Sequence, residues 1–303
     1  PLFRSGRTAR TSSRRKGKAM PALIIHGGAG RARTLAGQEA IRASLARIAE
    51  TAWSMILDGA PAVEVAIEAA RRLEDDPLFN AGLGSKLQSD GAARLSAALM
   101  DGACERFSGV INVEGLLNPI LLCAHLQTDR DRVLAGHGAL ERARMLGLAE
   151  GNVITEAARA NWREALEGET GTIGAVVCDV RGDIAAATST GGRGMERVGR
   201  VSDSATVAGN FASPSAGVSC TGIGEDIVDG ALAARLVASV DAGQPLAEAA
   251  SNLESKMRDR DWKAGVISLD SSCQWSAIHT TEVMYWTAMD ADGLHQFSFR
   301  DVP

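Results

Sequence analysis

Two apolar, β-rich runs in the middle of the chain, residues 172–179 and 184–190, limit its possible folds more than any other segment. They flank Arg181-Gly182-Asp183, a sequence that predicts a tight turn and therefore a hairpin. Other short apolar runs predict further strands at 22–25, 95–100, 217–220, 266–269, 275–281 and 294–299. The first of these runs into glycines, which predict a turn directly after it.

Helical periodicity separates the predicted strands. Apolar residues recur on one stripe at 37–57 and at 62–73. Asn118 and Pro119 predict an N-cap followed by proline at the first helical position. Similar patterns predict helices at 140–145, 154–166, 227–240 and 246–257. Both halves of the chain contain strands, helices and strands in turn, which indicates an α+β fold with helices covering a mainly antiparallel double sheet.

Charge and hydropathy exclude several classes of protein. The 303 residues are 45% hydrophobic, enough for a sizeable core, but no apolar run spans a membrane. Residues 1–19 carry seven Lys and Arg; removing these charges from the net charge of −5 leaves −12. An acidic body argues against nucleic-acid binding. We expect residues 1–20 to be a disordered basic arm, either a targeting segment or, as we favour, sequence upstream of a natural start at Met20.

The cysteines and histidines are scattered. Widely spaced cysteines without a CxxC pair predict free thiols and a cytoplasmic location. The five histidines do not cluster as zinc ligands would, so we expect no metal in the chemistry. The five cysteines are Cys104, Cys123, Cys178, Cys220 and Cys273.

Thr172 follows a glycine-rich linker at 168–171 and opens a predicted strand. A structural interpretation is sufficient for the pattern alone, because Thr starts strands well and Gly suits loops. A chemical interpretation is also available. If the bond after Gly171 is cut, Thr172 gains an α-amine with a pKa of about 7.7–8.0. That amine can accept the proton of the Thr172 hydroxyl, so one residue supplies both nucleophile and base.

Eight short motifs occur in a fixed order along the chain: HGGAG at 26–30, DPLFNAGLGS at 76–85, MDG at 100–102, NP at 118–119, GTIGAVVCD at 171–179, TSTGG at 188–192, GRVSDS at 199–204 and SCTGIGE at 219–225. Together they resemble the motifs of the isoaspartyl peptidase/L-asparaginase family, the plant-type asparaginases among the N-terminal nucleophile hydrolases. The resemblance covers residues 22 to about 290.

The resemblance implies a fold and an activity. The fold would be a four-layer αββα sandwich. Self-cleavage between Gly171 and Thr172 would divide one hydrolase domain into an α subunit, 21–171, and a β subunit, 172–303. Two such αβ units would form a homodimer. The activity would be hydrolysis of L-asparagine or of β-aspartyl (isoaspartyl) dipeptides, small-molecule substrates, through an acyl-enzyme on Thr172.

The resemblance also implies roles for individual residues. Thr172 matches the nucleophile, Thr190 a threonine that steadies it, and Asn80 a loop residue nearby. Thr221 and Gly222 match the oxyanion-hole donors. Substrate binding would fall to Arg200, Asp203, Gly222 and Gly224. A structural sodium ion would be bound by the backbone carbonyls of Leu73, Glu74, Asp76, Phe79, Ala81 and Leu83.

The two charged residues predicted to bind substrate, Arg200 and Asp203, are here called the anchors. Their charges suit the substrate even without the resemblance. An asparaginyl or aspartyl head carries an α-carboxylate and an α-ammonium. Arg200 can hold the carboxylate with two parallel hydrogen bonds, and Asp203 can pair with the ammonium. Without the neighbouring motifs, the same two residues would be read as an ion pair in a surface turn.

Several readings compete with the leading one. Gly27, Gly28 and Gly30 do not form a phosphate-binding loop, because the Gly-Lys-Ser/Thr ending is missing. His26 is interpreted as a structural histidine rather than a base. A related hydrolase, such as a glycosylasparaginase or threonine endopeptidase, and a non-catalytic ligand-binding protein stay open as alternatives. Departures from the family pattern leave substrate preference open; they fall at Leu83, Ser96, Ala98, 193–197, Ile223 and 279–281.

Overall fold

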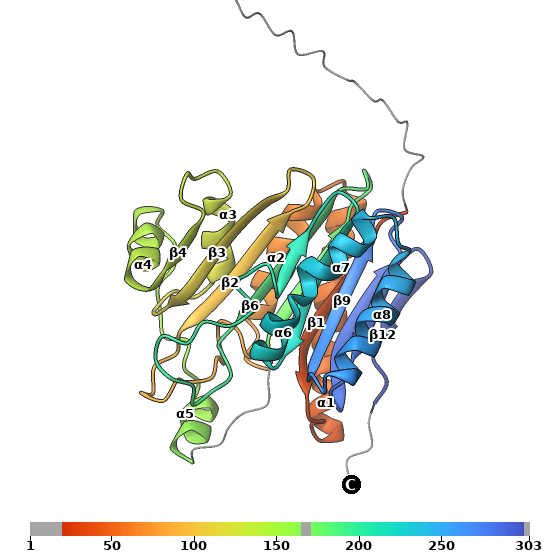
Figure 1. Cartoon of the computed structure of the whole chain (residues 1–303). Coiled ribbons are helices and arrows are strands. Elements are labelled where there is room, and N and C mark those ends of the chain that lie inside the picture. Colours follow the sequence, from red (N-terminus) through yellow and green to blue (C-terminus); the bar gives the residue numbers. More distant parts are fainter. Residues whose placement is uncertain (1–19, 165–170, 300–303) are drawn as a thin grey trace, which may run out of the picture.

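The computed structural model describes residues 20–164 and 171–299 (Figure 1). The basic arm predicted at 1–20 therefore lies outside the described residues except for Met20, and the linker predicted at 168–171 does so except for Gly171. Two β-sheets and eight helices form the described part of the chain, which confirms a mixed α+β fold.

The larger sheet has eight strands in the order β12-β11-β1-β5-β6-β2-β3-β4. Every neighbouring pair is antiparallel except β3 and β4. The predicted central hairpin is confirmed as β5 and β6. The strands are β1 (Ala22–Gly30), β2 (Leu95–Asp101), β3 (Arg106–Val113), β4 (Val133–Ala135), β5 (Ile173–Cys178), β6 (Ile184–Thr190), β11 (Val283–Asp290) and β12 (Gly293–Gln296).

The smaller sheet has four antiparallel strands in the order β10-β9-β8-β7. It faces the larger sheet across a shared apolar layer, a buried cluster that includes Ile24, Val176 and Ala186 of the larger sheet and Ile267 and Leu269 of the smaller one. The central strands are therefore buried on both faces, which explains their continuous apolar runs. The strands are β7 (Asn210–Ala212), β8 (Ala216–Gly222), β9 (Ala264–Asp270) and β10 (Trp275–His279).

Helices cover the outer face of each sheet (Figure 1). α1 (Leu35–Leu57), α2 (Ala62–Glu74) and α3 (Pro119–Leu126) pack on the larger sheet, and α7 (Leu232–Asp241) and α8 (Leu246–Asp259) pack on the smaller one. The predicted stripe of α1 is confirmed at Ile41, Leu45 and Ile48, whose burial contributes about 1.5–3 kcal/mol each, whereas Trp53 is only partly buried. The remaining helices are α4 (Gly136–Met145), α5 (Glu156–Arg163) and α6 (Gly224–Gly230).

The structure corrects two local predictions and confirms a third in part. The HGGAG glycines do not turn the chain: β1 continues to Gly30 through a bulge between His26 and Gly28, where Gly28 has φ +120°. The helix predicted at 227–240 breaks into α6 and α7 at Ala231, which has φ +46°. Asn118 and Pro119 occupy the predicted N-cap and first helical positions of α3, but the Asn118 side chain makes no capping hydrogen bond; its amide instead donates a hydrogen bond to Asp75.

The prediction that all five cysteines are free is wrong. Cys178, at the end of β5, forms a disulfide with Cys273, in the turn after β9, and so ties the two sheets together. The two residues are 95 positions apart in sequence but 5.9 Å apart between Cα atoms, a proximity that spacing cannot reveal. Free thiols were the argument for a cytoplasmic location, and the disulfide removes that argument. The location stays a prediction. No helix within the described ranges is long and apolar enough to cross a membrane.

Candidate active site

Thr172 lies immediately before β5 and is buried, with only 7% of its surface exposed. Pairing of Ile173 with Ser189 across the hairpin brings Thr172 beside Thr190, the last residue of β6. The Thr172 hydroxyl donates a hydrogen bond to Thr190 Oγ1 at 3.2 Å. Thr190 Oγ1 also accepts the Gly192 N–H at 3.1 Å. The hydroxyl of Thr172 is therefore held in a fixed position by the hairpin.

Thr221 and Gly222 end strand β8 of the smaller sheet. Thr221 Oγ1 accepts the Ala29 N–H at 3.2 Å, which leaves its own proton available to donate. Gly222 has φ +131°, and a Cβ atom there would collide with the carbonyl of Lys263. The backbone at this point consequently requires glycine.

Arg200, Ser202 and Asp203 form a connected group of opposite charges. Ser202 Oγ donates to Asp203 Oδ1 at 2.7 Å and lies 3.2 Å from Arg200 Nη2. Asp203 is 3% exposed, and no described residue bonds to its Oδ2. Burial raises the pKa of Asp203 to about 6, although the Ser202 hydrogen bond opposes the shift. Arg200 Nε and Nη2 also donate to the two oxygens of Glu225, at 2.8 and 2.7 Å.

A cavity of about 20 Å³ brings most of the predicted site residues together. Gly224 matters here because a Cβ atom at this position would overlap Ser202 Oγ and crowd Asp203. Thr221 does not line the cavity, but its neighbour Gly222 does. The predicted residues that line it are Thr172, Thr190, Arg200, Asp203, Gly222 and Gly224.

Asn80 lies in the loop after α2, next to Gly171. Its side chain donates to the Gly192 carbonyl at 2.6 Å and accepts the Lys86 N–H at 2.8 Å. Its carbonyl accepts the Gly191 N–H at 2.9 Å. A Cβ atom on Gly171 would lie 2.9 Å from the Asn80 Cβ, so the residue before Thr172 has little room for a side chain. Asn80 fixes the turn after Thr190.

Comparison with known proteins now decides the family. Residues 19–170 and 164–299 match the sequence model of a family described as Asparaginase. The chain belongs to the asparaginase family. The isoaspartyl peptidase/L-asparaginase of Nostoc sp. is 43% identical over 279 residues, covering 85% of this chain and 88% of the relative. That of Xenopus laevis is 33% identical over 291 residues, covering 91% and 94%. The plant-type L-asparaginase of Pyrococcus horikoshii is 34% identical over 307 residues, covering 91% and 98%.

A buried polar network lies between the sheets of this asparaginase-family chain, close to the nucleophile. His26 Nε2 is 2.9 Å from Ser219 Oγ, which is 2.6 Å from Thr188 Oγ1. Thr188 Oγ1 in turn donates to Asn210. Burial lowers the pKa of His26 to about 3, against a smaller opposing effect of a backbone hydrogen bond with Thr172. His26 is thus a neutral, buried histidine in a hydrogen-bonded network, and its structural role stays a prediction.

The loop from Leu73 to Leu83 has features that suit an alkali cation. A Cβ atom on Gly82 would strike the Glu74 carbonyl, and one on Gly84 would lie 2.8 Å from the Pro77 carbonyl oxygen and 3.0 Å from that of Phe79. Several neutral carbonyl oxygens therefore converge on two glycines, and hard cations prefer such ligands. Glu74 and Phe79 were predicted from the sequence, whereas Pro77 was not. The described residues include no cluster of His, Cys, Asp and Glu side chains arranged to hold a metal.

Sequence reasoning missed two residues that touch the anchors. The Glu225 carboxylate accepts a hydrogen bond from the Arg200 guanidinium, and Ser202 links Arg200 to Asp203 through hydrogen bonds. Both lie inside motifs that had been recognised, so the available signal was a charged or hydroxyl side chain next to a predicted anchor. Among the departures from the family pattern, Ser96 pairs directly with Thr190 across β2 and β6.

Proposed function

We propose that this protein cleaves its own chain before Thr172 and then hydrolyses L-asparagine and β-aspartyl dipeptides through a threonyl acyl-enzyme. The observation that carries the proposal is a single cavity holding the Thr172 hydroxyl, the Arg200 cation and the Asp203 carboxylate. The names of the relatives support the same substrates.

Self-cleavage follows from the position of Thr172. Its Oγ attacks the carbonyl carbon of Gly171, and the C–N bond breaks as the acyl group moves from nitrogen to oxygen. Water then hydrolyses the resulting ester, which frees a carboxylate on Gly171 and an amine on Thr172. The larger sheet would hold the products together, because β1 lies between β5 and β11, and β6 pairs with β2. We propose that 21–171 and 172–303 form such intertwined α and β subunits.

Amide hydrolysis uses the groups freed by cleavage. The substrate α-carboxylate pairs with Arg200 and its ammonium with Asp203, which brings the amide carbon to Thr172. The Thr172 amine takes the hydroxyl proton as the O–C bond forms, and Thr221 and Gly222 stabilise the oxyanion. The amine then passes the proton to the leaving nitrogen, and the C–N bond breaks. Water hydrolyses the ester and releases aspartate.

The finer architecture is part of the same proposal. Helices outside two facing sheets support a four-layer αββα sandwich of the N-terminal nucleophile hydrolase type. We propose a homodimer of αβ units, supported by exposed apolar side chains near the site; a sedimentation mass of one chain would exclude it. These side chains are Val198, Val201, Val207, Ile223 and Val228.

The loop from Leu73 to Leu83 would hold a structural sodium ion, which supplies rigidity rather than chemistry. Because a ligand that binds only the folded state stabilises it, sodium chloride should raise the melting temperature more than choline chloride at equal ionic strength. Differential scanning fluorimetry measures the difference. Identical melting curves in the two salts would rule out the sodium site.

The relatives do not favour the alternatives, a glycosylasparaginase-like hydrolase or a non-catalytic ligand-binding protein. The deciding experiment incubates purified protein with L-asparagine, β-aspartyl-leucine and a glycosylated asparagine. We expect ammonia from the first and leucine from the second, together with a fragment whose N-terminal sequence is Thr-Ile-Gly-Ala. A single intact chain that turns over neither substrate would refute the proposal.

A further inference from the structure

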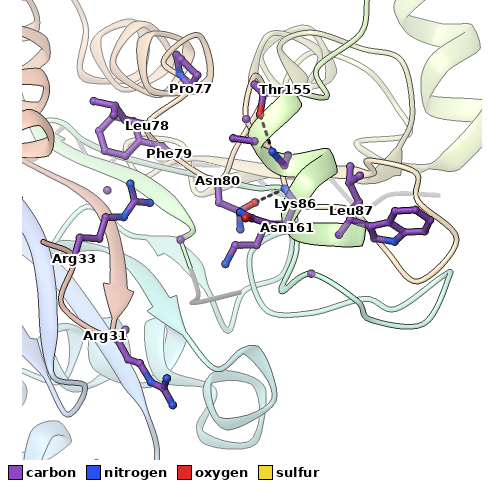
Figure 2. A pocket seen from close by; sticks show the side chains of 18 of the residues that line it. Arg31, Arg33, Pro77, Leu78, Phe79, Asn80, Lys86, Leu87, Thr155 and Asn161 are labelled. Carbon is purple, nitrogen blue, oxygen red and sulfur yellow. Dashed lines mark hydrogen bonds between the residues drawn. The ribbon is translucent and has the colours of Figure 1, made fainter. Parts of the chain in front are cut away.

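A second and much larger cavity, of about 480 Å³, opens on the other side of the nucleophile (Figure 2). Its lining includes Gly171 and Asn80, whereas Thr172 lines the small anchor cavity. In Figure 2, Asn80 lies between the arginines that follow β1 and the helix α5. The volume falls within the range of small-molecule sites.

The proposed reaction fixes which part of a substrate would enter this cavity. The Thr172 amine gives its proton to the leaving nitrogen, so the leaving group lies beside that amine. The amine nitrogen is the atom that was bonded to Gly171. The leaving group therefore points toward Gly171 and Asn80, away from Arg200 and Asp203. Ammonia released from asparagine is too small to reach the walls, whereas an amino acid released from a dipeptide is not.

The charge on these walls differs from that of the whole protein. The described lining residues include Arg31, Arg33 and Lys86 but no Asp or Glu, although the chain carries −5 overall. The Arg33 backbone N–H donates to the Tyr285 hydroxyl at 2.8 Å, which fixes this segment against β11. In Figure 2 the Arg33 side chain extends toward Phe79, whereas the Arg31 side chain extends away from it. The Arg33 guanidinium in such a setting suits a carboxylate.

The rest of the lining is largely apolar. Leu78, Phe79, Leu87 and Trp162 contribute hydrophobic surface. The Trp162 indole N–H donates to the Gln88 carbonyl at 2.9 Å, which orients the ring. A cationic edge beside an apolar wall matches an amino acid with a free carboxylate and an apolar side chain.

We propose that this cavity is a leaving-group subsite that binds the C-terminal amino acid of a β-aspartyl dipeptide, with Arg33 pairing with its carboxylate. The inference rests on the proposed function and adds a preference to it: the protein favours dipeptides with an apolar, carboxylate-bearing second residue over asparagine. Binding energy gained here, remote from the reacting bond, raises kcat/KM for the dipeptide alone.

The test compares three substrates: β-aspartyl-leucine, β-aspartyl-leucinamide, which lacks the carboxylate, and L-asparagine. We expect R33Q to lower the ratio of kcat/KM for β-aspartyl-leucine over asparagine by about 10–100-fold, the loss expected for charge-assisted hydrogen bonds. The wild type should prefer β-aspartyl-leucine over its amide by a similar factor, and R33Q should not.

Two further variants guard against indirect effects. Arg33→Lys retains a positive charge and should recover part of the ratio. Arg159→Gln removes an exposed arginine of α5 that does not line the cavity, and should leave the ratio unchanged. An unaltered ratio in R33Q, or equal rates for the leucine and leucinamide substrates, would overturn the subsite while asparagine hydrolysis still supported the proposed function. Loss of all hydrolysis by the wild type would overturn both.

Discussion

We expect replacement of Thr172 with alanine to lower both chain cleavage and amide hydrolysis by at least about 10³-fold. In the proposed mechanism one oxygen atom attacks first the Gly171 carbonyl and then every substrate. The fold should survive, because the Thr172 hydroxyl makes a hydrogen bond of 3.2 Å to Thr190, whose loss costs about 1 kcal/mol. Gel electrophoresis measures cleavage, and ammonia release from asparagine measures hydrolysis.

Thr172→Ser is the matched control, because it retains the hydroxyl and the future amine. We expect it to cleave and to hydrolyse, more slowly than the wild type. A circular-dichroism spectrum unchanged in Thr172→Ala would show that the loss is chemical rather than structural. If Thr172→Ala were cut at the same bond, or released ammonia at the wild-type rate, Thr172 would not be the nucleophile.

Local patterns predicted the elements whose signals are strong and self-contained. The stripe at 37–57 and the hairpin around Gly182 are specified within about twenty residues, and both were confirmed. β11 was missed: no strand was predicted at residues 283–290. It pairs with β1, more than 250 positions away, and that partner makes it a strand. The turn predicted at the HGGAG glycines was wrong for a similar reason, because the strands on either side of β1 hold this segment in an extended conformation.

The candidate site likewise has residues that local motifs could predict and contacts that they could not. The ordered motifs indicated six residues that line one cavity, because the family resemblance assigns a role to particular side chains within each motif. The Arg200–Glu225 ion pair, the disulfide and the basic cavity each depend on how separate elements meet in space. No spacing rule on one sequence reports those distances.

Asp203→Asn should lower kcat/KM for asparagine by about 10²–10³-fold, the cost of removing one partner of a buried charge pair. Asparagine is nearly the same size, so Gly209 and Gly224, which leave room for the carboxylate, need not move. The neutral amide cannot balance the substrate ammonium. Steady-state assays with asparagine measure the loss, and Asp203→Glu, which restores the charge at a longer reach, is the control. An unchanged kcat/KM in Asp203→Asn would exclude this anchor.

The pH profile separates this role from a structural one. Burial raises the pKa of Asp203 to about 6, with Ser202 and Arg200 opposing and Glu225 reinforcing the shift, so the carboxylate that binds substrate is lost as pH falls through about 6. The Thr172 amine, with a pKa of about 7.7–8.0, already gives log kcat/KM a slope of one below its own pKa. The wild type should therefore steepen to a slope of two below about pH 6, whereas Asp203→Asn keeps a slope of one. Stability moves the other way: a raised acid pKa means that the folded state binds the proton more tightly, so this group adds stability as pH falls from about 6 toward 3.8. Between about pH 6 and 3.8, activity should therefore fall while the stability contributed by Asp203 rises. Opposite changes of this kind identify a carboxylate that is kept charged for substrate binding and that lowers the stability of the fold.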